Sequence, residues 1–266
     1  MKKRLDVLLT ERGFFQSREK AKASIMAGLV FVDGVRHDKA GMPVDENAPI
    51  EVRGNDCPYV SRGGYKLEKA LQSFNIDVTG FRCVDIGAST GGFTDCLLQN
   101  GAEKVYSVDV GYGQLAWSLR QDPRVVCMEK VNFRYMQEGD IPELLDFACA
   151  DVSFISLKHM FPVAVKLLKD GGLMATLVKP QFEAGREKVG KGGIVRDSAV
   201  HREVLQQVME YAREAGFRVL SVDYSPVTGA KGNIEFLMYL IKDSTAQDSS
   251  IDIDAVVEKA HKELDK

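Results

Sequence analysis

Three charged residues lie at the ends of strongly apolar stretches in this sequence. Asp151 follows "LDFACA", Lys179 follows "LMATLV", and Glu235 precedes "FLMYLI". A single charge at such a position is often only a capping or snorkelling side chain. Two acids and a lysine at neighbouring strand ends indicate more, because burying an unpaired charge is costly and pairing the three creates a site. A lysine in such a site can act as a general base.

A glycine-rich segment, "VDIGASTGGFTD" at residues 84 to 95, follows another apolar stretch and opens a helix. Its glycines let the backbone turn sharply and approach a ligand closely. The segment lacks the second glycine of a dinucleotide fingerprint. Instead, Asp85 stands directly before the first glycine, and Asp109 follows about twenty residues later, where an acid commonly binds a ribose. The pattern favours S-adenosylmethionine; the alternatives are a structural turn and an Asp109 that caps the next helix.

The elements that must position these residues alternate between apolar strands and helices from residue 80 onward. This alternation predicts a Rossmann-like, doubly wound α/β sheet of seven mostly parallel strands. A short loop at residues 226–233, without a helix, joins the last two strands, so one of them is expected to run antiparallel. The stretch "YKLEKALQSFNI" before the sheet is expected to be a helix. The expected strands span residues 82–87, 104–110, 124–129, 146–154, 172–182, 218–225 and 234–241.

The first part of the chain has a different pattern, which predicts two short helices and a hairpin. Ser17 is a plausible N-cap of the second helix, which should stop at Gly28. The dipeptide Asp33-Gly34 between two apolar runs is typical of a hairpin turn. We therefore expect a small α+β domain at residues 1–60, a large domain at 61–242, an acidic tail at 243–266 with no function that we can read, and a boundary near 55–61.

Composition narrows the class of protein further. Residues 1–40 carry nine Lys and Arg against five Asp and Glu, whereas residues 243–266 carry three against seven. The basic head indicates local attraction to a polyanion despite the overall net charge of −3. The five cysteines form no CxxC pair, so a reducing cytoplasm is expected. The basic amino terminus is not expected to be a signal peptide, because Asp6 and Glu11 interrupt its apolar part.

The segments "SRGGYKLEKAL", "VDIGASTGGFTD", "DVSFIS", "LVKPQFE" and "GNIEF" resemble the TlyA (haemolysin A) family of FtsJ-like ribosomal RNA 2′-O-methyltransferases. The resemblance covers almost the whole chain apart from the acidic tail. It implies an S4-like RNA-binding domain followed by a class I S-adenosylmethionine-dependent methyltransferase domain. It also implies ribosomal RNA or ribosomal subunits as the partner and methyl transfer to a cytidine ribose.

The resemblance further implies a catalytic tetrad of Lys66, Asp151, Lys179 and Glu235. Spacing alone leaves Lys66 as a solvated helix lysine. In the tetrad we expect Lys179 to accept the proton of the ribose hydroxyl, because a partly desolvated lysine near a second cation can serve as a base. Lys66 would stabilise the developing alkoxide, and the two acids would orient the ammonium groups. No metal is expected, because the four histidines have no ligand spacing.

Two sets of binding residues complete the expected site. The expected cofactor-binding residues are Asp85, Gly87, Ser89, Thr90, Gly91, Gly92, Phe93, Asp109 and Asp151. The expected RNA-binding residues are Arg4, Arg18, Lys20, Lys22, Arg62, Arg186, Lys188 and Lys191. The last three lie in the loop at residues 183–197, which is either a lid over RNA or a mobile connection.

Two other classes of protein compete with this hypothesis. An RNA-binding regulator with an inactive methyltransferase domain is disfavoured because the residues of the site are intact. A membrane-active haemolysin would need a secretion signal, a spanning segment or a strongly amphipathic cationic helix, and we find none of these in the sequence.

Overall fold

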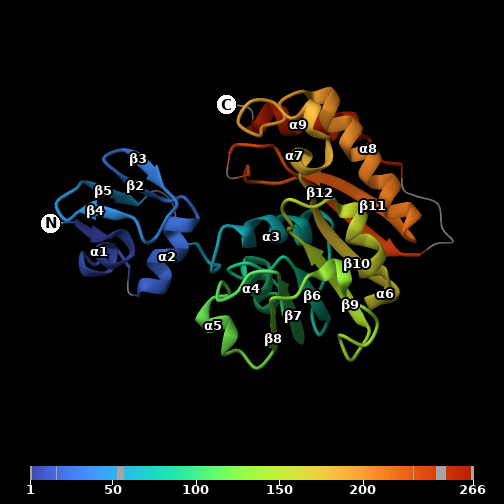
Figure 1. Cartoon of the computed structure of the whole chain (residues 1–266), viewed down its shortest axis with the longest axis horizontal. Coiled ribbons are helices and arrows are strands. Elements are labelled where there is room, and N and C mark those ends of the chain that lie inside the picture. Colours follow the sequence, from blue (N-terminus) through green and yellow to red (C-terminus); the bar gives the residue numbers. More distant parts are fainter. Residues whose placement is uncertain (1, 16, 53–56, 230, 244–249, 265–266) are drawn as a thin grey trace.

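The computed structural model describes residues 2–15, 17–52, 57–229, 231–243 and 250–264, which fold into a small and a large unit (Figure 1). The elements of the small unit are, in chain order, β1 (Lys2–Arg4), α1 (Leu5–Glu11), α2 (Arg18–Met26), β2 (Val30–Val32), β3 (Val35–His37), β4 (Pro43–Asp45) and β5 (Ile50–Val52). Strand β2 lies between β3 and β5 in one antiparallel sheet, and β4 pairs with β1.

Local signals in the sequence account for the small unit. The Ser17 hydroxyl accepts a hydrogen bond from the backbone amide of Lys20 and so caps α2, as predicted. Asp33 and Gly34 both have positive φ angles, 52° and 76°, which suits the tight turn between β2 and β3. Leu5, Leu9 and Ile25, among others, are fully buried and hold α1 and α2 together over the strands.

The large unit is built on a seven-stranded sheet with the order β11-β12-β10-β9-β6-β7-β8. Its strands are β6 (Arg82–Ile86), β7 (Lys104–Asp109), β8 (Val125–Glu129), β9 (Leu145–Ala150), β10 (Leu168–Val178), β11 (Phe217–Tyr224) and β12 (Phe236–Lys242). Strand β12 runs antiparallel to both of its neighbours, β10 and β11, whereas the pairs from β10 to β8 are parallel. The predicted mostly parallel sheet with one antiparallel strand is confirmed.

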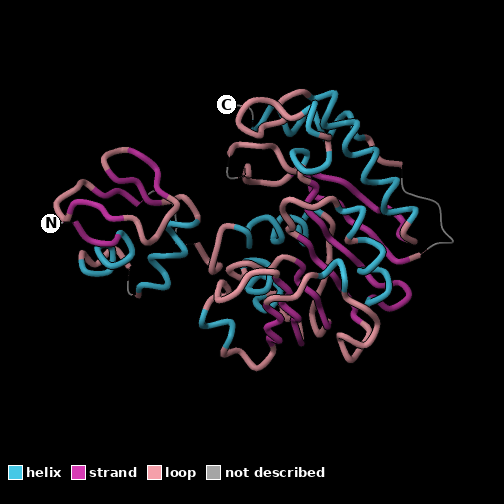
Figure 2. The backbone as a smooth tube through the Cα atoms, viewed as in Figure 1, coloured by secondary structure: helices cyan, strands magenta, loops and turns pink. Residues whose placement is uncertain are grey.

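Helices cover both faces of this sheet (Figure 2). One face packs against α3 (Gly63–Ser73), α4 (Gly92–Gln99) and α5 (Trp117–Arg120). The other face packs against α6 (Phe161–Leu167), α8 (Ser198–Glu214) and α9 (Ile253–Leu264). The sheet therefore separates two apolar cores. The helices cover its faces and leave the ends of its strands open. No helix among the described residues has the length and the apolar character that a membrane span needs.

Two features adjust the expected division of the chain. Helix α9 lies in the acidic tail, but Val257 and Ala260 are fully buried against the large unit, so this helix belongs to the packed structure. Tyr59 is 5% exposed, and its ring packs edge-on against Tyr65. The core of the large unit thus begins before residue 60. Part of the expected linker, residues 53–56, lies outside the described residues, and the division at residue 60 stays a prediction.

Candidate active site

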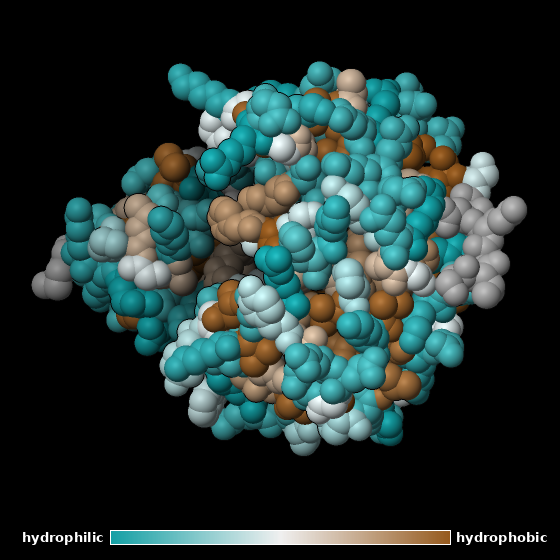
Figure 3. Space-filling view, turned by 45° about the vertical axis from the view of Figure 1, so that its right-hand side comes forward, coloured by the Kyte–Doolittle hydropathy of each residue, from teal (hydrophilic) through white to brown (hydrophobic). Residues whose placement is uncertain are grey.

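A cavity of about 590 Å³ lies at the carboxyl edge of the sheet, next to the small unit. Its walls come from the glycine-rich loop after β6, the residues that follow β9 and β10, and the loop that precedes β12. From the turned viewpoint of Figure 3, the surface is hollowed between the two units, and apolar residues gather around the hollow. The edge at which the sequence placed the charged residues is therefore a recess.

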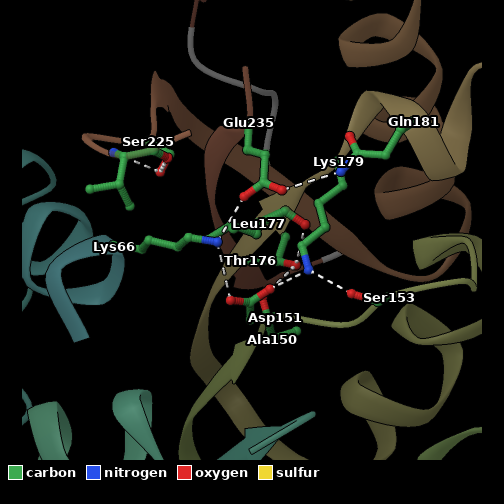
Figure 4. A network of polar contacts seen from close by, with 11 residues as sticks. Lys66, Ala150, Asp151, Ser153, Thr176, Leu177, Lys179, Gln181, Ser225 and Glu235 are labelled. Atoms are coloured by element: carbon green, nitrogen blue, oxygen red, sulfur yellow. Dashed lines mark hydrogen bonds and ion pairs between the residues drawn. The ribbon is translucent and has the colours of Figure 1, made fainter. Parts of the chain in front are cut away.

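The four charged residues of the expected tetrad meet in this cavity (Figure 4). The Lys66 ammonium lies 2.7 Å from Glu235 Oε2 and 3.4 Å from Asp151 Oδ2. The Lys179 ammonium lies 2.5 Å from Asp151 Oδ1 and donates a hydrogen bond to the Ser153 hydroxyl at 3.0 Å. The contact of Lys179 to Oδ1 is an ion pair, so each oxygen of the Asp151 carboxylate faces a different ammonium group.

The topology of the sheet explains why these residues meet. Asp151 directly follows β9, and its backbone amide donates to the Ile86 carbonyl at the end of β6. Lys179 directly follows β10, and Glu235 directly precedes β12. The last pair in the register of β10 and β12 is Val178 with Phe236. Lys179 comes directly after Val178, and Glu235 comes directly before Phe236, so the two residues lie at the same edge. An antiparallel strand can in this way present its first residues at the edge where parallel strands end.

Lys66 comes from α3, whose buried face packs on the sheet. Its residue is 7% exposed, and it contacts two carboxylates. The interpretation from spacing alone, a solvated helix lysine, is therefore wrong. Local pattern did not reveal the burial because the partners of Lys66 lie 85 and 169 residues further along the chain.

The ionisation of the site follows from burial and charge pairing. Burial acts to lower the pKa of Lys66, but Asp151 and Glu235 outweigh it, so the pKa is raised and the ammonium stays charged. Burial acts to raise the pKa of Asp151, but the two nearby lysines outweigh it, and the pKa is lowered. At neutral pH the site thus holds a fixed cation at Lys66 and a fixed anion at Asp151.

The glycine-rich loop closes tightly over the sheet. A side chain at Gly87 would meet the Asp151 carbonyl oxygen at 2.9 Å, and one at Gly92 would meet the Gly64 backbone nitrogen at 2.9 Å. Gly87 and Gly91 also have positive φ angles. These glycines let the loop and the first turn of α4 approach both α3 and the cavity. Of the expected cofactor residues, the cavity is lined by Asp85, Gly87, Ser89, Thr90, Gly92, Phe93 and Asp151.

Asp85 lies beneath this loop and is fully buried. Its Oδ2 accepts hydrogen bonds from the Thr94 amide at 2.9 Å and the Thr94 hydroxyl at 2.7 Å. Its Oδ1 is buried and has no hydrogen-bond partner among the described residues. Burial raises the pKa of this carboxyl to about 7, despite the hydrogen bonds from Thr94 that lower it. The free oxygen at the cavity wall suits a cationic hydrogen-bond donor.

Asp109 ends β7 outside the wall of the cavity. Its two oxygens accept hydrogen bonds from the backbone amides of Ser89, at 2.8 Å, and Gly111, at 2.7 Å. Each carboxylate oxygen can accept a second donor. The residue therefore organises the glycine-rich loop from outside the cavity, and Gly91 likewise does not line it.

Phe154, Gln181 and Phe182 are among the lining residues of the cavity that the sequence reasoning missed. The Phe154 residue is 90% exposed and has a φ of 64°, and its ring lies 4.9 Å from that of Phe182. Gln181 donates to Glu235 Oε1 at 3.2 Å, while its own Oε1 is buried without a hydrogen-bond partner among the described residues. Their position beside Asp151 and Lys179 in "DVSF" and "KPQF" was the available signal.

The expected RNA-binding residues are spread over several surfaces. Arg62 lines the cavity, and Lys20 and Lys22 line a separate groove. Arg4 and Arg18 both pair with Asp6, whose pKa is about 2 because these pairs outweigh its burial. In the loop at 183–197, Lys188 pairs with Glu203. Neither cavity is lined by Arg4, Arg18, Arg186, Lys188 or Lys191.

That loop is attached to the site through one amide side chain. The Asn233 side chain accepts from the Val195 amide at 2.9 Å and donates to the Gly193 carbonyl at 2.9 Å. Asn233 is 3% exposed and stands two residues before Glu235. Asn233 thus links the carboxyl-terminal part of the loop to the segment that carries Glu235. Among the described residues, no group of three or more His, Cys, Asp or Glu side chains is arranged to hold a metal ion.

Comparisons with known proteins agree with this architecture. Residues 59–242 match the family model of FtsJ-like methyltransferases, and residues 3–50 match that of the S4 domain. The chain is 53% identical to a Bacillus subtilis protein whose name includes "rRNA methyltransferase", over 99% of this chain and 95% of that protein. It is 44% identical to the "16S/23S rRNA (cytidine-2'-O)-methyltransferase TlyA" of Mycobacterium tuberculosis, over 89% of each chain.

Solved structures show the same fold. A protein structure from Streptococcus thermophilus is 51% identical and covers 99% of this chain and 97% of its own, with a TM-score of 0.81. A structure from Listeria monocytogenes, whose name includes "S-adenosylmethionine dependent methyltransferase", is 17% identical and covers 68% of this chain and 99% of its own, with a TM-score of 0.50. The second likeness concerns the fold alone.

Proposed function

The chain belongs to the FtsJ-like methyltransferases and, within them, to the TlyA (haemolysin A) family, and from this premise we propose that it methylates a cytidine 2′-hydroxyl in ribosomal RNA. The methyl donor would be S-adenosylmethionine. The S4 domain and the names of the relatives support ribosomal RNA as the substrate. A ribosomal substrate implies action in the cytoplasm.

One observation carries the proposal: Lys66 and Lys179 share the Asp151 carboxylate inside a cavity that also borders the glycine-rich loop. A cation held in place beside a second lysine suits a reaction in which a hydroxyl loses its proton. Methyl transfer to a ribose is such a reaction, because a 2′-hydroxyl is a weak acid and a poor nucleophile at neutral pH.

The residues of the glycine-rich loop fit the proposed cofactor. The unpartnered Asp85 Oδ1 is an acceptor for the ammonium group of the methionine moiety. Gly87 and Gly92 leave no room for a side chain and so let the backbone contact a ligand. Asp109 would accept the ribose hydroxyls at the rim. When bound, S-adenosylmethionine supplies an electrophilic methyl group on its sulfonium.

The tetrad would divide the remaining work. Lys179, in its unprotonated form, would accept the proton of the 2′-hydroxyl while the hydroxyl oxygen bonds to the methyl carbon. Lys66 keeps its charge because two carboxylates raise its pKa, and it would stabilise the negative charge that develops on that oxygen. Asp151 and Glu235 would keep both nitrogens within reach of the acceptor, and positioning of this kind lowers the entropic barrier.

The mouth of the cavity suits an extruded nucleotide. The Phe154 ring is almost fully exposed and lies beside Phe182, which offers a flat apolar surface for a base. Arg62 and Lys231 line the same cavity and can contact phosphates. A nucleotide that leaves its stack could place its base on this surface and its 2′-hydroxyl beside the tetrad.

The proposal is tested by incubating purified ribosomal subunits with the protein and S-adenosylmethionine that carries a radiolabelled methyl group. We expect label in the RNA, and mapping of the modified position should identify a cytidine methylated on its 2′-oxygen. Label on a base, or label in ribosomal protein alone, would show that the reaction class is wrong. The Lys179→Ala variant serves as the control for a contaminating methyltransferase.

A further inference from the structure

A second cavity, of about 930 Å³, forms a groove between the small and the large unit. One wall is α2 of the small unit, and the other is the segment from Tyr112 to Arg120, which leads into and includes α5. The segment that precedes α3, residues 57–60, forms the floor. None of the tetrad residues lines this groove, so it is distinct from the cavity described above.

The wall from the large unit presents two exposed aromatic residues. Tyr112 is 73% exposed and Trp117 is 67% exposed, and both line the groove. Isolated exposed apolar residues are common on protein surfaces and by themselves indicate nothing. Here two of them border one groove, and both have flat faces on which a nucleobase can stack.

The opposite wall is basic. Lys20 and Lys22 project from α2 into the groove, and in the described part of the chain neither has an ion-pair partner. Two acids also border the groove. Asp95 keeps its charge, and its oxygens accept hydrogen bonds from the Val60 amide and the Gln99 side chain. Glu19 is exposed on α2, and Arg120 pairs with Glu129. On the α2 wall itself, two lysines thus stand against one acid, Glu19.

The groove continues into the catalytic cavity. Met26 and Thr90 line both the groove and the cavity. The two sites are therefore adjacent, and one RNA strand can reach both. A site that combines an aromatic wall with lysines is the arrangement by which proteins bind single-stranded nucleic acid. A neutral apolar ligand would not need the lysines, and a duplex would not need the aromatic rings.

We infer that this groove binds an unpaired nucleotide of the RNA substrate beside the target cytidine. Its base stacks on Trp117, and its phosphate contacts Lys20 and Lys22. The inference rests on the proposed function. It adds that the groove is a second RNA subsite, which recognises an unpaired nucleotide. The competing occupant is the adenosine part of the cofactor, because Thr90 also belongs to the glycine-rich loop.

Trp117 is itself the probe for this inference, since it is the one tryptophan in the sequence. We expect its fluorescence to be quenched when the full-length protein is titrated with a single-stranded oligoribonucleotide of about eight to ten nucleotides. Quenching should weaken as salt rises. S-adenosylmethionine alone should leave the emission nearly unchanged. Emission that responds to the cofactor and not to RNA would overturn the inference and assign the groove to adenosine.

Kinetics provide the second measurement. In single-turnover methylation of ribosomal subunits, Trp117→Ala should raise the half-saturating RNA concentration roughly ten-fold, the effect of losing one stacked base. The affinity for S-adenosylmethionine should not change, and Trp117→Phe should retain most of the RNA affinity. Tyr135→Ala is the matched control, because Tyr135 is equally exposed, at 70%, but lines neither cavity.

The two proposals fail in different ways. If the unmodified protein does not methylate subunits, the proposed function fails, whereas the fluorescence titration still reports on the groove. If the unmodified protein methylates subunits and Trp117→Ala has the same half-saturating RNA concentration, the groove is not an RNA subsite.

Discussion

Lys66 and Lys179 contact different oxygens of one carboxylate, that of Asp151, at 3.4 Å and 2.5 Å. The two lysines are not equivalent. Lys66 has a second acid, Glu235, at 2.7 Å, whereas Lys179 has the neutral Ser153 hydroxyl. The second carboxylate helps to raise the pKa of Lys66 and holds it in its charged form, whereas the second contact of Lys179 is to a neutral group. The predictions for the tetrad follow from this asymmetry.

Lys179→Ala should slow methyl transfer by at least roughly 10²- to 10⁴-fold, the usual contribution of a general base. Lys179→Arg should be impaired to a similar degree, because a guanidinium stays protonated and cannot accept the proton. Single-turnover assays with saturating cofactor measure both effects. If the arginine variant keeps most of the rate, Lys179 supplies only positive charge, and the base must be another group.

Lys66→Met should destabilise the fold by about 3–5 kcal/mol, because it leaves Glu235 buried beside a second carboxylate without its cation. Urea unfolding followed by circular dichroism measures this cost. The double variant Lys66→Met with Glu235→Gln removes both charges and should recover most of the stability while methyl transfer stays low. A double variant as unstable as the single one would contradict the assigned pairing.

Asp85 should make stability depend on pH. The folded-state pKa of this carboxyl is raised from 3.8 to about 7, so between these values the folded chain binds a proton that the unfolded chain has lost. Stability should therefore fall as pH rises from about 4 to 7. The stability of Asp85→Asn relative to wild type should rise over the same window by up to roughly 4 kcal/mol. Unfolding free energies that stay parallel from pH 4 to 8 would contradict this environment.

Asp109→Ala should weaken S-adenosylmethionine binding by about 1–3 kcal/mol, because ribose hydroxyls lose an acceptor and the Ser89 amide is released. Isothermal titration calorimetry gives the affinity directly. Asp122→Ala removes the same charge from a carboxylate that pairs with Arg124 outside both cavities, and it should bind normally. Equal affinities for all three proteins would remove Asp109 from the cofactor site.

Deletion of residues 1–52 should leave a folded protein that binds cofactor but no longer methylates ribosomal subunits. The deletion stops there because Tyr59 packs in the core of the large unit. The basic residues of the small unit are expected to attract RNA, so binding of the full-length protein should fall steeply with salt. Filter binding measures the affinity for RNA, and methylation assays measure methyl transfer. A truncated protein with full activity on subunits would contradict an RNA-binding role of the small unit.

The strands could be predicted from sequence because each is a short apolar run bounded by turn residues, but two of the expected ends were wrong. The strands expected at 146–154 and 172–182 stop four residues earlier, at Ala150 and Val178, where the chain leaves the sheet. Asp151, Lys179 and Glu235 follow from that pattern. The burial of Lys66 could not be read from α3 alone, since its partners come from the far ends of other elements. Phe154 was hidden for the opposite reason: an aromatic residue after an apolar strand suggests burial, yet this residue is 90% exposed. The polar composition of the tail likewise concealed the packing of Val257 and Ala260.

The place of β12 in the sheet affects how the protein folds during its synthesis. Lys66 and Glu235 are 169 residues apart, and translation produces the chain from its amino end. At bacterial or eukaryotic rates of synthesis, on the order of ten seconds or more separate the two residues. The small unit, α3 and the first strands can fold in that interval, but the middle of the sheet lacks the strand between β10 and β11. The site can therefore assemble only after β12 has been synthesised.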